Sequence, residues 1–330
     1  MNLRQIYEPI ADDLKLVEGL LASSISESND HYGPVMRSLL VESPGKRIRP
    51  ALVFLSERAA SAGRSSTCDR RGLIEIATAV ELIHIASLIH DDVLDGATMR
   101  HSRPTINARY GDDVSIVLGD YIYSKAFQLI GNCGNTDIFA CMSEAIHSMC
   151  QGELMHVCQR RNLDLSKDSY IVIAKKKTAS LFAASCHAGT IIGNHSRDLQ
   201  TALKEFGLNF GVAFQIVDDC RDVISEEGEL GKQPGQDVIT GDVTLPLLTL
   251  SDTVGRAERE EIKNMLGSAN DKASLSRLRA MLANSDALCK TEQVVTSYLA
   301  GAKERLNSLA DSVYKESLSR LVEHTTQRSF

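Results

Sequence analysis

The chain has no proline between Pro104 and Pro234, and in that stretch apolar residues recur at helical rather than alternating spacing. Four segments are apolar around most of their circumference: 73–95, 114–130, 170–192 and 203–224. Helices of this kind lie at the centre of a large bundle rather than on its surface. The pattern therefore predicts an all-α protein built on a bundle of long helices.

Short segments rich in turn-forming residues interrupt the helical pattern at 43–46, 61–66, 131–136, 193–197 and 226–242. None of them is a long flexible linker, so the sequence predicts a single domain over residues 1–330. The C-terminal third is more charged and less regularly amphipathic, which suits peripheral helices that cover the core.

The motif D-D-x-x-D occurs twice, as DDVLD at 91–95 and DDCRD at 218–222, each time at the end of a strongly apolar stretch. Positions i and i+4 of a helix lie on one face, so each motif should present two carboxylates in one direction. A single motif is as often a solvated helix end. Two copies predict clusters that hold Mg²⁺, which takes carboxylate oxygens and leaves positions for phosphates.

Basic residues that could bind the anion lie near these motifs. GKRIRP at 45–50 places cations at a predicted helix start, where backbone N–H groups also favour anions. Arg100 and His101 follow the first acidic motif.

Three polar residues belong to otherwise apolar helices. Lys177 and Thr178 are the pair expected to face inward, because the apolar run ASLFAA follows them directly. The lysines just before them are expected to be solvated. Gln215 stands one turn before the second acidic motif and, if buried, needs a hydrogen-bond partner.

Composition narrows the class of protein. There are 36 basic and 43 acidic residues, and the resulting net charge of −7 disfavours nucleic acid as a partner. The eight cysteines form no C-x-x-C pair and are expected to be reduced. No uncharged apolar run reaches the roughly twenty residues that span a bilayer. The N-terminus lacks the features of a secretion signal, which predicts a cytoplasmic protein.

These features together indicate one chemistry. Metal ions can draw a diphosphate away from an allylic carbon, and a dry apolar cavity protects the resulting cation from water. No Ser-His-Asp or Cys-His arrangement suggests a covalent nucleophile.

The chain resembles the trans-polyprenyl diphosphate synthases of the octaprenyl and solanesyl type over nearly its whole length. The resemblance rests on motifs in the family's order and approximate spacing: GKRIRP, ELIHIASLIHDDVLD, GDYIYSKAFQ, KKKTASLF, GVAFQIVDDCRD and TLPLL. It implies an isoprenoid synthase-type bundle of mostly antiparallel helices around a central cavity, usually as a homodimer. It also implies a Mg²⁺-dependent condensation of isopentenyl diphosphate with an allylic prenyl diphosphate.

The resemblance implies roles for individual residues. The Mg²⁺ ligands on the allylic diphosphate would be Asp91, Asp95, Asp218 and Asp222, supported by Asp92 and Asp219. Isopentenyl diphosphate would be bound by Lys46, Arg49 and His84, and the allylic diphosphate by Arg100, Lys177 and Lys232. Thr178 and Gln215 would direct oxygen dipoles toward the allylic cation.

Two positions depart from the family pattern. Where the family usually has M-R-R-G, His101 replaces the second arginine, a substrate ligand, with a weaker and pH-dependent donor. Where the family usually has G-K-x-T-L-P, Asp242 replaces a phosphate-binding cation. We expect a diphosphate contact to be lost there.

The helix that carries DDVLD also bears on product length. Ala86 and Ser87 are small, whereas short-chain members usually place a tunnel-blocking aromatic just before the acidic motif. The expected product is therefore longer than geranylgeranyl diphosphate, in the hexaprenyl-to-decaprenyl range, with Phe127 among the deeper tunnel walls. If Ala86 and Ser87 only pack against a neighbouring helix, a geranylgeranyl-length product remains an alternative.

Two further alternatives concern the activity itself. A non-catalytic subunit of a heteromeric synthase usually loses its acidic motifs, but His101 and Asp242 keep this alternative open. A terpene cyclase shares the first D-D-x-x-D, although DDCRD and GKRIRP are atypical of that class.

Overall fold

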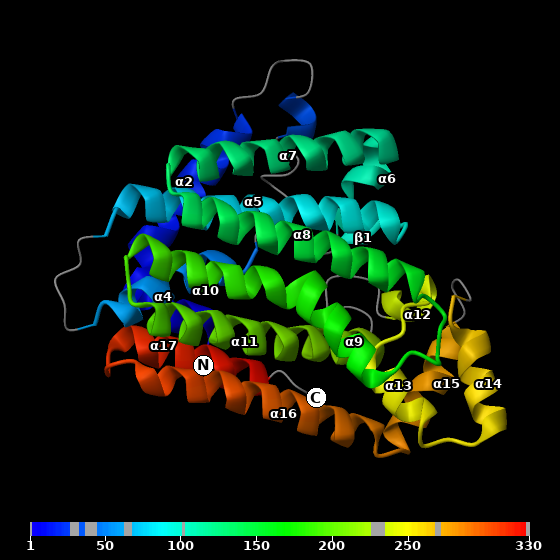
Figure 1. The fold of residues 1–330 in the computed structure, drawn as a ribbon. Helices are drawn as coiled ribbons and strands as arrows, with labels where there is room; N and C mark the ends of the chain where they lie inside the picture. The colour runs from blue at the N-terminus through cyan, green and yellow to red at the C-terminus, as the bar shows by residue number, and fades with distance from the viewer. Residues whose placement is uncertain are drawn as a thin grey trace. The chain divides into compact units, whose positions relative to one another are not determined.

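The computed structural model describes residues 2–26, 33–36, 45–62, 68–100, 103–225, 235–267 and 272–327. Within these ranges the regular elements are helices, apart from one short antiparallel pair of strands (Figure 1). In chain order they are α1 (Leu3–Ile6), η1 (Glu8–Ile10), α2 (Ala11–Ser26), α4 (Ile48–Ala60), α5 (Arg70–Leu94), β1 (Met99–Arg100), β2 (Arg103–Pro104), α6 (Ile106–Tyr110), α7 (Asp112–Asn132), α8 (Thr136–Cys158), α9 (Lys167–Ala174), η2 (Lys175–Ala179), α10 (Ser180–Ile192), α11 (Arg197–Ile224), α12 (Gln236–Thr240), α13 (Leu245–Ser251), α14 (Arg256–Met265), α15 (Lys272–Ala283), α16 (Ala287–Arg305), η3 (Leu306–Ser308) and α17 (Val313–Thr326). The predicted all-α class is confirmed.

The apolar segments predicted as central helices correspond to α5, α7 and α11, and to the series α9, η2 and α10. In that series the sequence predicts one uninterrupted helix, whereas η2 is a π-helical turn. A π-turn adds a residue to one turn and is frequent at functional sites. The periodicity does not show it, because the apolar residues on either side still face the interior.

The chain divides into two compact units, and the expectation of a single domain stays a prediction. The first unit comprises Met1–Ile146, Leu181–Gly207 and Arg305–Leu321. Within it α5 packs against α7, α4 and α2. Asp69 begins α5 by accepting a hydrogen bond from the Arg71 N–H, and Asp95 ends it. The end of α5 therefore carries the first acidic motif.

Helix α5 is also long and apolar enough to cross a membrane, the one such helix in the part of the chain described. Of its most apolar stretch, 78% is buried inside the structure. Such burial is typical of the core helix of a globular protein.

A tight connection follows α5 and turns the chain back toward the acidic motif. The strands β1 and β2 pair antiparallel, with Arg100 opposite Arg103. The Ala97 N–H donates to the carbonyl oxygen of Asp92 over 2.9 Å. This turn brings the Arg100 side chain next to the end of α5.

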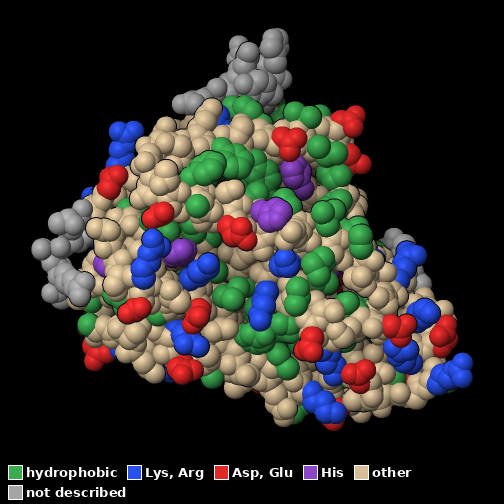
Figure 2. Space-filling view, viewed as in Figure 1, with side chains coloured by type: hydrophobic (Ala, Val, Ile, Leu, Met, Phe, Trp, Pro, Cys, Tyr) green, Lys and Arg blue, Asp and Glu red, His purple; other side chains and the backbone are tan. Residues whose placement is uncertain are grey.

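Helix α7 exposes several apolar side chains, among them Val117, Ile116 and Phe127. Figure 2 shows hydrophobic side chains gathered over this helix. Single exposed apolar residues are ordinary, whereas a gathering of them is typical of an interaction surface.

The second unit comprises His147–Ser180, Leu208–Glu304 and Val322–Phe330. Within it α13 packs against α9, α14 and α15. A Cβ atom at Gly152 of α8 would lie only 2.2 Å from the backbone nitrogen of Lys177. Glycine therefore allows the backbones of α8 and η2 to touch, and this contact sets the position of Lys177.

Candidate functional site

The first acidic motif stands at the end of α5, in the first unit. Asp92 is buried, and one of its carboxylate oxygens accepts hydrogen bonds from two nitrogens of Arg100, at 2.7 and 2.9 Å. Burial would lower the pKa of Arg100, but Asp92 and then Asp91 and Asp95 raise it above its ordinary value. Asp91 and Asp95 lie one turn apart and are partly exposed. The three carboxylates and Arg100 thus form one charged group.

The predicted isopentenyl diphosphate residues of the first unit lie around the start of α4 and the middle of α5. The guanidinium of Arg49 lies over the Phe182 ring, 4.3 Å from its centroid. Lys46 is exposed just before α4. Arg47 has a different role, because it forms ion pairs with Glu18 at 2.6 Å and with Glu81 at 2.7 Å.

His84 lies among cations. Burial of the imidazole and the positive charge of three arginines hold its pKa well below the ordinary value; the arginines are Arg49, Arg100 and Arg47. The ring is therefore neutral near pH 7. His84 can offer a diphosphate a hydrogen bond but not a charge, a distinction that the sequence did not show.

The two small residues before the first motif differ in their surroundings. Ala86 is fully buried, whereas Ser87 is partly exposed and donates to the His84 carbonyl oxygen over 2.8 Å. Successive helical residues point about 100° apart, so only Ser87 shares the face of Asp91. Phe127, expected among the deeper tunnel walls, is 42% exposed on α7. This exposure does not favour a place in a buried wall, and the outward side of α7 was not evident from its nearly all-apolar sequence.

The second acidic motif ends α11, in the second unit, and its residues are buried to different depths. Asp218 is exposed, whereas Asp219 and Asp222 are buried. The Asp222 carboxylate accepts a hydrogen bond from the Asp237 N–H over 2.9 Å, and its carbonyl accepts one from the Gly235 N–H over 2.8 Å. That Asp218 and Asp222 present two carboxylates in one direction stays a prediction, and the structure adds that the two differ in burial. Helical spacing gives a shared face, but the chain around α12 covers one end of it.

Hydrogen bonds link Thr178 of η2 to this motif through Gln215. The Thr178 hydroxyl donates to Gln215 Oε1 over 2.5 Å, and Gln215 Nε2 donates to Asp219 Oδ1 over 2.6 Å. The expectation that Gln215 needs a partner is confirmed. Because the Thr178 hydroxyl gives its proton to Gln215, its oxygen can act toward other groups only as an acceptor.

Tyr170 of α9 completes this group and was missed in the sequence. Its hydroxyl donates to Asp219 Oδ2. Burial raises the pKa of Asp219 to about 6, although the hydrogen bonds from Tyr170 and Gln215 favour the ionised form. A tyrosine at the start of an apolar helix is a weak signal, because its partner lies 49 residues away.

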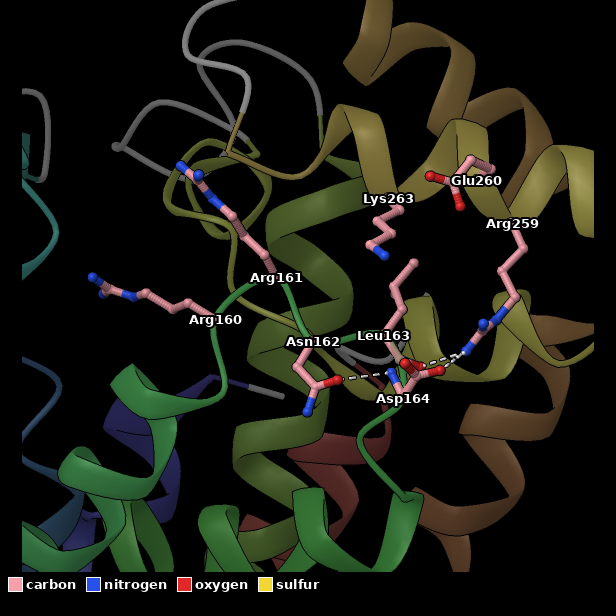
Figure 3. Close-up of a pocket in the computed structure, with 8 residues that line it drawn as sticks. All are labelled: Arg160, Arg161, Asn162, Leu163, Asp164, Arg259, Glu260 and Lys263. Atoms are coloured by element: carbon pink, nitrogen blue, oxygen red, sulfur yellow. Dashed lines mark hydrogen bonds and ion pairs between the residues drawn. The ribbon is translucent and has the colours of Figure 1, made fainter.

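A pocket of about 280 Å³ lies elsewhere in the second unit (Figure 3). Its lining consists of Arg160, Arg161, Asn162, Leu163, Asp164, Arg259, Glu260 and Lys263. Arg259 pairs with Asp164 at 2.8 Å, and the guanidinium groups of Arg160 and Arg161 point away from that pair. None of the residues predicted from the sequence lines this pocket.

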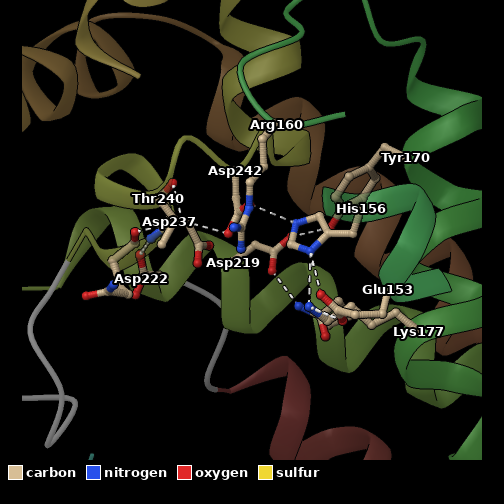
Figure 4. A network of polar contacts seen from close by, with 12 residues as sticks. Glu153, His156, Arg160, Tyr170, Lys177, Asp219, Asp222, Asp237, Thr240 and Asp242 are labelled. Carbon is tan, nitrogen blue, oxygen red and sulfur yellow. Dashed lines mark hydrogen bonds and ion pairs between the residues drawn. The ribbon is translucent and has the colours of Figure 1, made fainter. Parts of the chain in front are cut away.

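The Lys177 ammonium is held by two residues of α8 (Figure 4). Its Nζ lies 2.7 Å from Glu153 Oε2 and 3.0 Å from His156 Nδ1. Burial alone would raise the pKa of Glu153, but the neighbouring His156 and the charge and hydrogen bond of Lys177 lower it to about 2. Lys177 and Thr178 are both partly buried, as is Lys176, so the inward orientation expected for the pair stays a prediction. Lys176 instead donates to Gln151 Oε1 over 2.6 Å.

Asp242, the anion at a position where a cation is usual, is buried and paired. Its Oδ1 accepts from Arg160 Nε over 2.8 Å and lies 3.4 Å from His156 Nε2. Its Oδ2 accepts from the Thr240 hydroxyl over 2.7 Å. The carboxylate is thus neutralised by its neighbours, which the sequence did not show because Arg160 lies 82 positions away.

Two predicted substrate ligands, His101 and Lys232, lie outside the described residues. The carboxylates of both motifs are hard oxygen donors and fit Mg²⁺ by their chemistry. No three His, Cys, Asp or Glu side chains in the described ranges gather closely enough for a ready-made metal site.

Comparison with known proteins gives a consistent result. The family model for polyprenyl synthetase matches residues 35–283. Heptaprenyl diphosphate synthase component 2 of Geobacillus stearothermophilus is 32% identical, over 94% of this chain and 93% of the relative. A short chain isoprenyl diphosphate synthase of Methanothermobacter thermautotrophicus is 29% identical, over 99% of this chain and 98% of the relative.

The solved structures include a polyprenyl synthase from Caulobacter crescentus, complexed with calcium and isoprenyl diphosphate. It is 28% identical, with a TM-score of 0.92, over 100% of this chain and 98% of that one. The family match covers most of the chain, including both acidic motifs. The chain belongs to the polyprenyl synthetase family.

Proposed function

We propose that this protein is a Mg²⁺-dependent trans-polyprenyl diphosphate synthase that joins isopentenyl diphosphate to an allylic prenyl diphosphate. One observation carries the proposal. Thr178, Gln215 and Asp219 form a continuous hydrogen-bonded group, with Lys177 directly adjacent to Thr178. An anion ligand, an oxygen acceptor for a cation and an acidic motif are thereby held together, as an allylic diphosphate requires.

The charged residues divide by the substrate that they would bind. Arg100, Lys177 and Lys232 would bind the allylic diphosphate, while Lys46, Arg49, His84 and His101 would bind isopentenyl diphosphate. Two substrate anions would therefore meet two separate sets of donors. His84, whose pKa is lowered by burial and by arginines, would contribute as a neutral hydrogen-bond donor.

The acidic residues would hold the metal. The ligands would be Asp91, Asp95, Asp218 and Asp222, and the charge of bound Mg²⁺ would stabilise the departing diphosphate. Asp92 and Asp219 would act indirectly, because Arg100 and Gln215 already bind their carboxylates. The calcium complex of the Caulobacter crescentus protein supports a divalent cation in this family.

The reaction would proceed by loss of diphosphate from the allylic carbon. The isopentenyl double bond would then attack that carbon, and a proton would leave to the released diphosphate. The Thr178 hydroxyl oxygen would face the cationic carbon with its lone pairs, because its proton is donated to Gln215. Gln215 in turn is held by Asp219, so the acceptor group is fixed before the cation forms.

We further propose a product in the hexaprenyl-to-decaprenyl range. The support is Ser87, a small side chain on the face of α5 that carries Asp91, where an aromatic ring would block a growing tail. The names of the two relatives span short-chain and heptaprenyl synthases, so family membership alone leaves the length open.

The exposed apolar side chains of α7 support a homodimer formed through that helix. One relative is named as a component of its enzyme, so a partner of different sequence is the alternative to a second copy. We place the enzyme in the cytoplasm.

One assay tests the activity. The purified protein is incubated with Mg²⁺, farnesyl diphosphate and labelled isopentenyl diphosphate, and the products are sized. Chain extension to thirty carbons or more is expected. No reaction would indicate a non-catalytic subunit, and release of a hydrocarbon would indicate a terpene cyclase.

A further inference from the structure

We infer that Glu153 and His156 form a cradle that positions the Lys177 ammonium for the allylic diphosphate, and that Asp242 orients His156 within it. These are positioning residues that act through Lys177. The inference rests on the role proposed for Lys177.

The backbone brings the cradle and the lysine together. A Cβ at Gly152 would lie 2.2 Å from the Lys177 nitrogen and 2.6 Å from its Cα, so α8 and the π-turn η2 are in direct backbone contact. Glu153 follows this contact at once. His156, three positions later, lies on the same face of α8. The backbone contact therefore places Glu153 and His156 close enough to Lys177 for their side chains to contact its ammonium.

The cradle holds a side chain that is otherwise flexible. Lysine has a four-carbon stem and a point charge, so its ammonium has many positions unless partners fix it. Glu153 Oε2 at 2.7 Å supplies an ionic partner, and His156 Nδ1 at 3.0 Å supplies a second direction. Two partners from one rigid helix define the position of Nζ before substrate binds (Figure 4).

The contact with Lys177 fixes which nitrogen of His156 carries the proton. An ammonium can only donate, so Nδ1 accepts in this contact and the ring N–H lies at Nε2. That nitrogen faces Asp242 Oδ1 at 3.4 Å. A carboxylate at this place favours the required tautomer and ring orientation.

Asp242 is itself firmly held. Arg160 Nε and the Thr240 hydroxyl donate to its two oxygens, at 2.8 and 2.7 Å, and the side chain is buried. A lysine here would set a cation beside Arg160 and toward the Nε2 proton of His156. The departure from the family pattern thus has a purpose other than losing a phosphate contact, because the anion serves the histidine that holds Lys177.

The experiment compares two substitutions of His156. His156→Leu keeps much of the volume but loses both polar contacts, and we expect the KM for the allylic diphosphate to rise roughly tenfold. His156→Gln keeps an oxygen for Lys177 and an N–H for Asp242, and its KM should stay within about threefold of wild type. The KM for isopentenyl diphosphate should be unchanged in both. If His156 had only a structural role, His156→Leu would change the KM for both substrates alike, and His156→Gln would not restore the wild-type values.

A second arm places His156→Leu in a Lys177→Met background. Because His156 acts through Lys177, the double variant should have the same allylic KM as Lys177→Met alone. Lys176→Met is the matched control, since that lysine binds Gln151, and its KM values should equal those of wild type.

The outcomes separate the inference from the proposed function. If Lys177→Met leaves the allylic KM unchanged, the role proposed for Lys177 fails. Suppose that Lys177→Met raises the allylic KM and that adding His156→Leu raises it further by as much as His156→Leu does alone. The inference that His156 acts through Lys177 is then wrong, whereas the proposed function stands. Should His156→Leu not fold, Glu153→Gln and Asp242→Asn, close in shape to the native residues, replace it with the same expectation of a selective rise in the allylic KM.

Discussion

At the residue scale, the six aspartates of the two acidic motifs differ in what surrounds them. Asp218 is exposed on α11, whereas the buried Asp222 accepts a hydrogen bond from the Asp237 N–H. Substitution of the first removes charge from the surface. Substitution of the second leaves a buried donor without its acceptor, at a cost of about 1–3 kcal/mol. Substitution of two aspartates of the same motif should therefore have different effects on stability.

We predict that Asp218→Ala or Asp91→Ala abolishes chain extension, while the melting temperature stays within a few degrees of wild type. Each change relieves repulsion among carboxylates without opening a core cavity. Asp222→Ala should lose activity and stability together, because of the Asp237 contact. Turnover and thermal unfolding by circular dichroism measure the two effects. Near-wild-type turnover in Asp218→Ala would contradict the assignment of the second motif.

A second prediction concerns pH and His84, whose pKa lies well below its ordinary value because of burial and three arginines. The native state then binds fewer protons than the unfolded chain below about pH 6.5, the usual pKa of histidine. The free energy of unfolding should therefore fall as the pH drops from 6.5, by about 1.4 kcal/mol per unit for this residue. His84→Gln should be less sensitive to pH over that range in urea unfolding. Equal slopes for both proteins would show that His84 is charged in the folded state.

The sequence identified the charged and polar residues that would contact substrate or metal. It did not identify the residues that contact those side chains and fix their positions. Lys177, Thr178 and Gln215 were found because polar residues in apolar helices need a reason. Glu153 and His156 were missed, because a glutamate and a histidine on an amphipathic helix look like a solvated face. Their importance depends on the contact of α8 with η2, which no local pattern records.

At the element scale, the sequence predicted the long apolar helices well but not the short or irregular ones. The apolar segments 73–95 and 114–130 closely match α5 and α7, because nearly continuous apolar residues can only be buried as helices at that length. The periodicity did not reveal the π-turn η2 within 170–192. It also did not show that α12 covers Asp222, since short helices that follow turns leave a weak pattern.

Gly152 provides a prediction about helix contact. Gly152→Ala would force α8 away from η2, because the new Cβ would overlap the Lys177 backbone at 2.2 Å. We expect a loss of about 1–3 kcal/mol in unfolding free energy and a higher allylic KM. Gly19→Ala in α2, where a Cβ meets nothing within 4 Å, is the control and should be neutral or stabilising by up to about 1 kcal/mol. If the two substitutions change the unfolding free energy equally, helix propensity rather than the contact between α8 and η2 determines the effect.

The α5 face that carries Asp91 provides a prediction about product length. Ser87→Phe places a ring on that face and should shift products to fifteen or twenty carbons without preventing the first condensation. Ala86→Phe should instead cost stability, because Ala86 is fully buried and the ring overpacks its surroundings. Product sizing and thermal unfolding distinguish them. An active Ser87→Phe variant with unchanged products would contradict the proposed path of the growing chain.

At the scale of the whole molecule, the remaining question is what covers the apolar side chains of α7. Val117 is 67% exposed, and Ile116 and Phe127 are exposed on the same helix. Burying such a surface against a second copy removes apolar area from water at about 25 cal/mol per Å². In a symmetric dimer each interface residue is present in both copies, so a substitution changes the interface at two places. A single charge on this helix should therefore have an effect on association far larger than its effect on folding.

We predict that Val117→Glu converts a dimer into a monomer with little change in secondary structure. The introduced carboxylates would be desolvated in both copies, and unpaired buried charge is costly. Val313→Glu is the matched control, since Val313 is 56% exposed at the start of α17, outside the α7 face. Sedimentation equilibrium gives the mass of each variant. If Val117→Glu remains a dimer, the proposed interface is wrong. If wild type is already a monomer, the apolar face of α7 must serve a partner of different sequence, and the activity assay should then depend on supplying it.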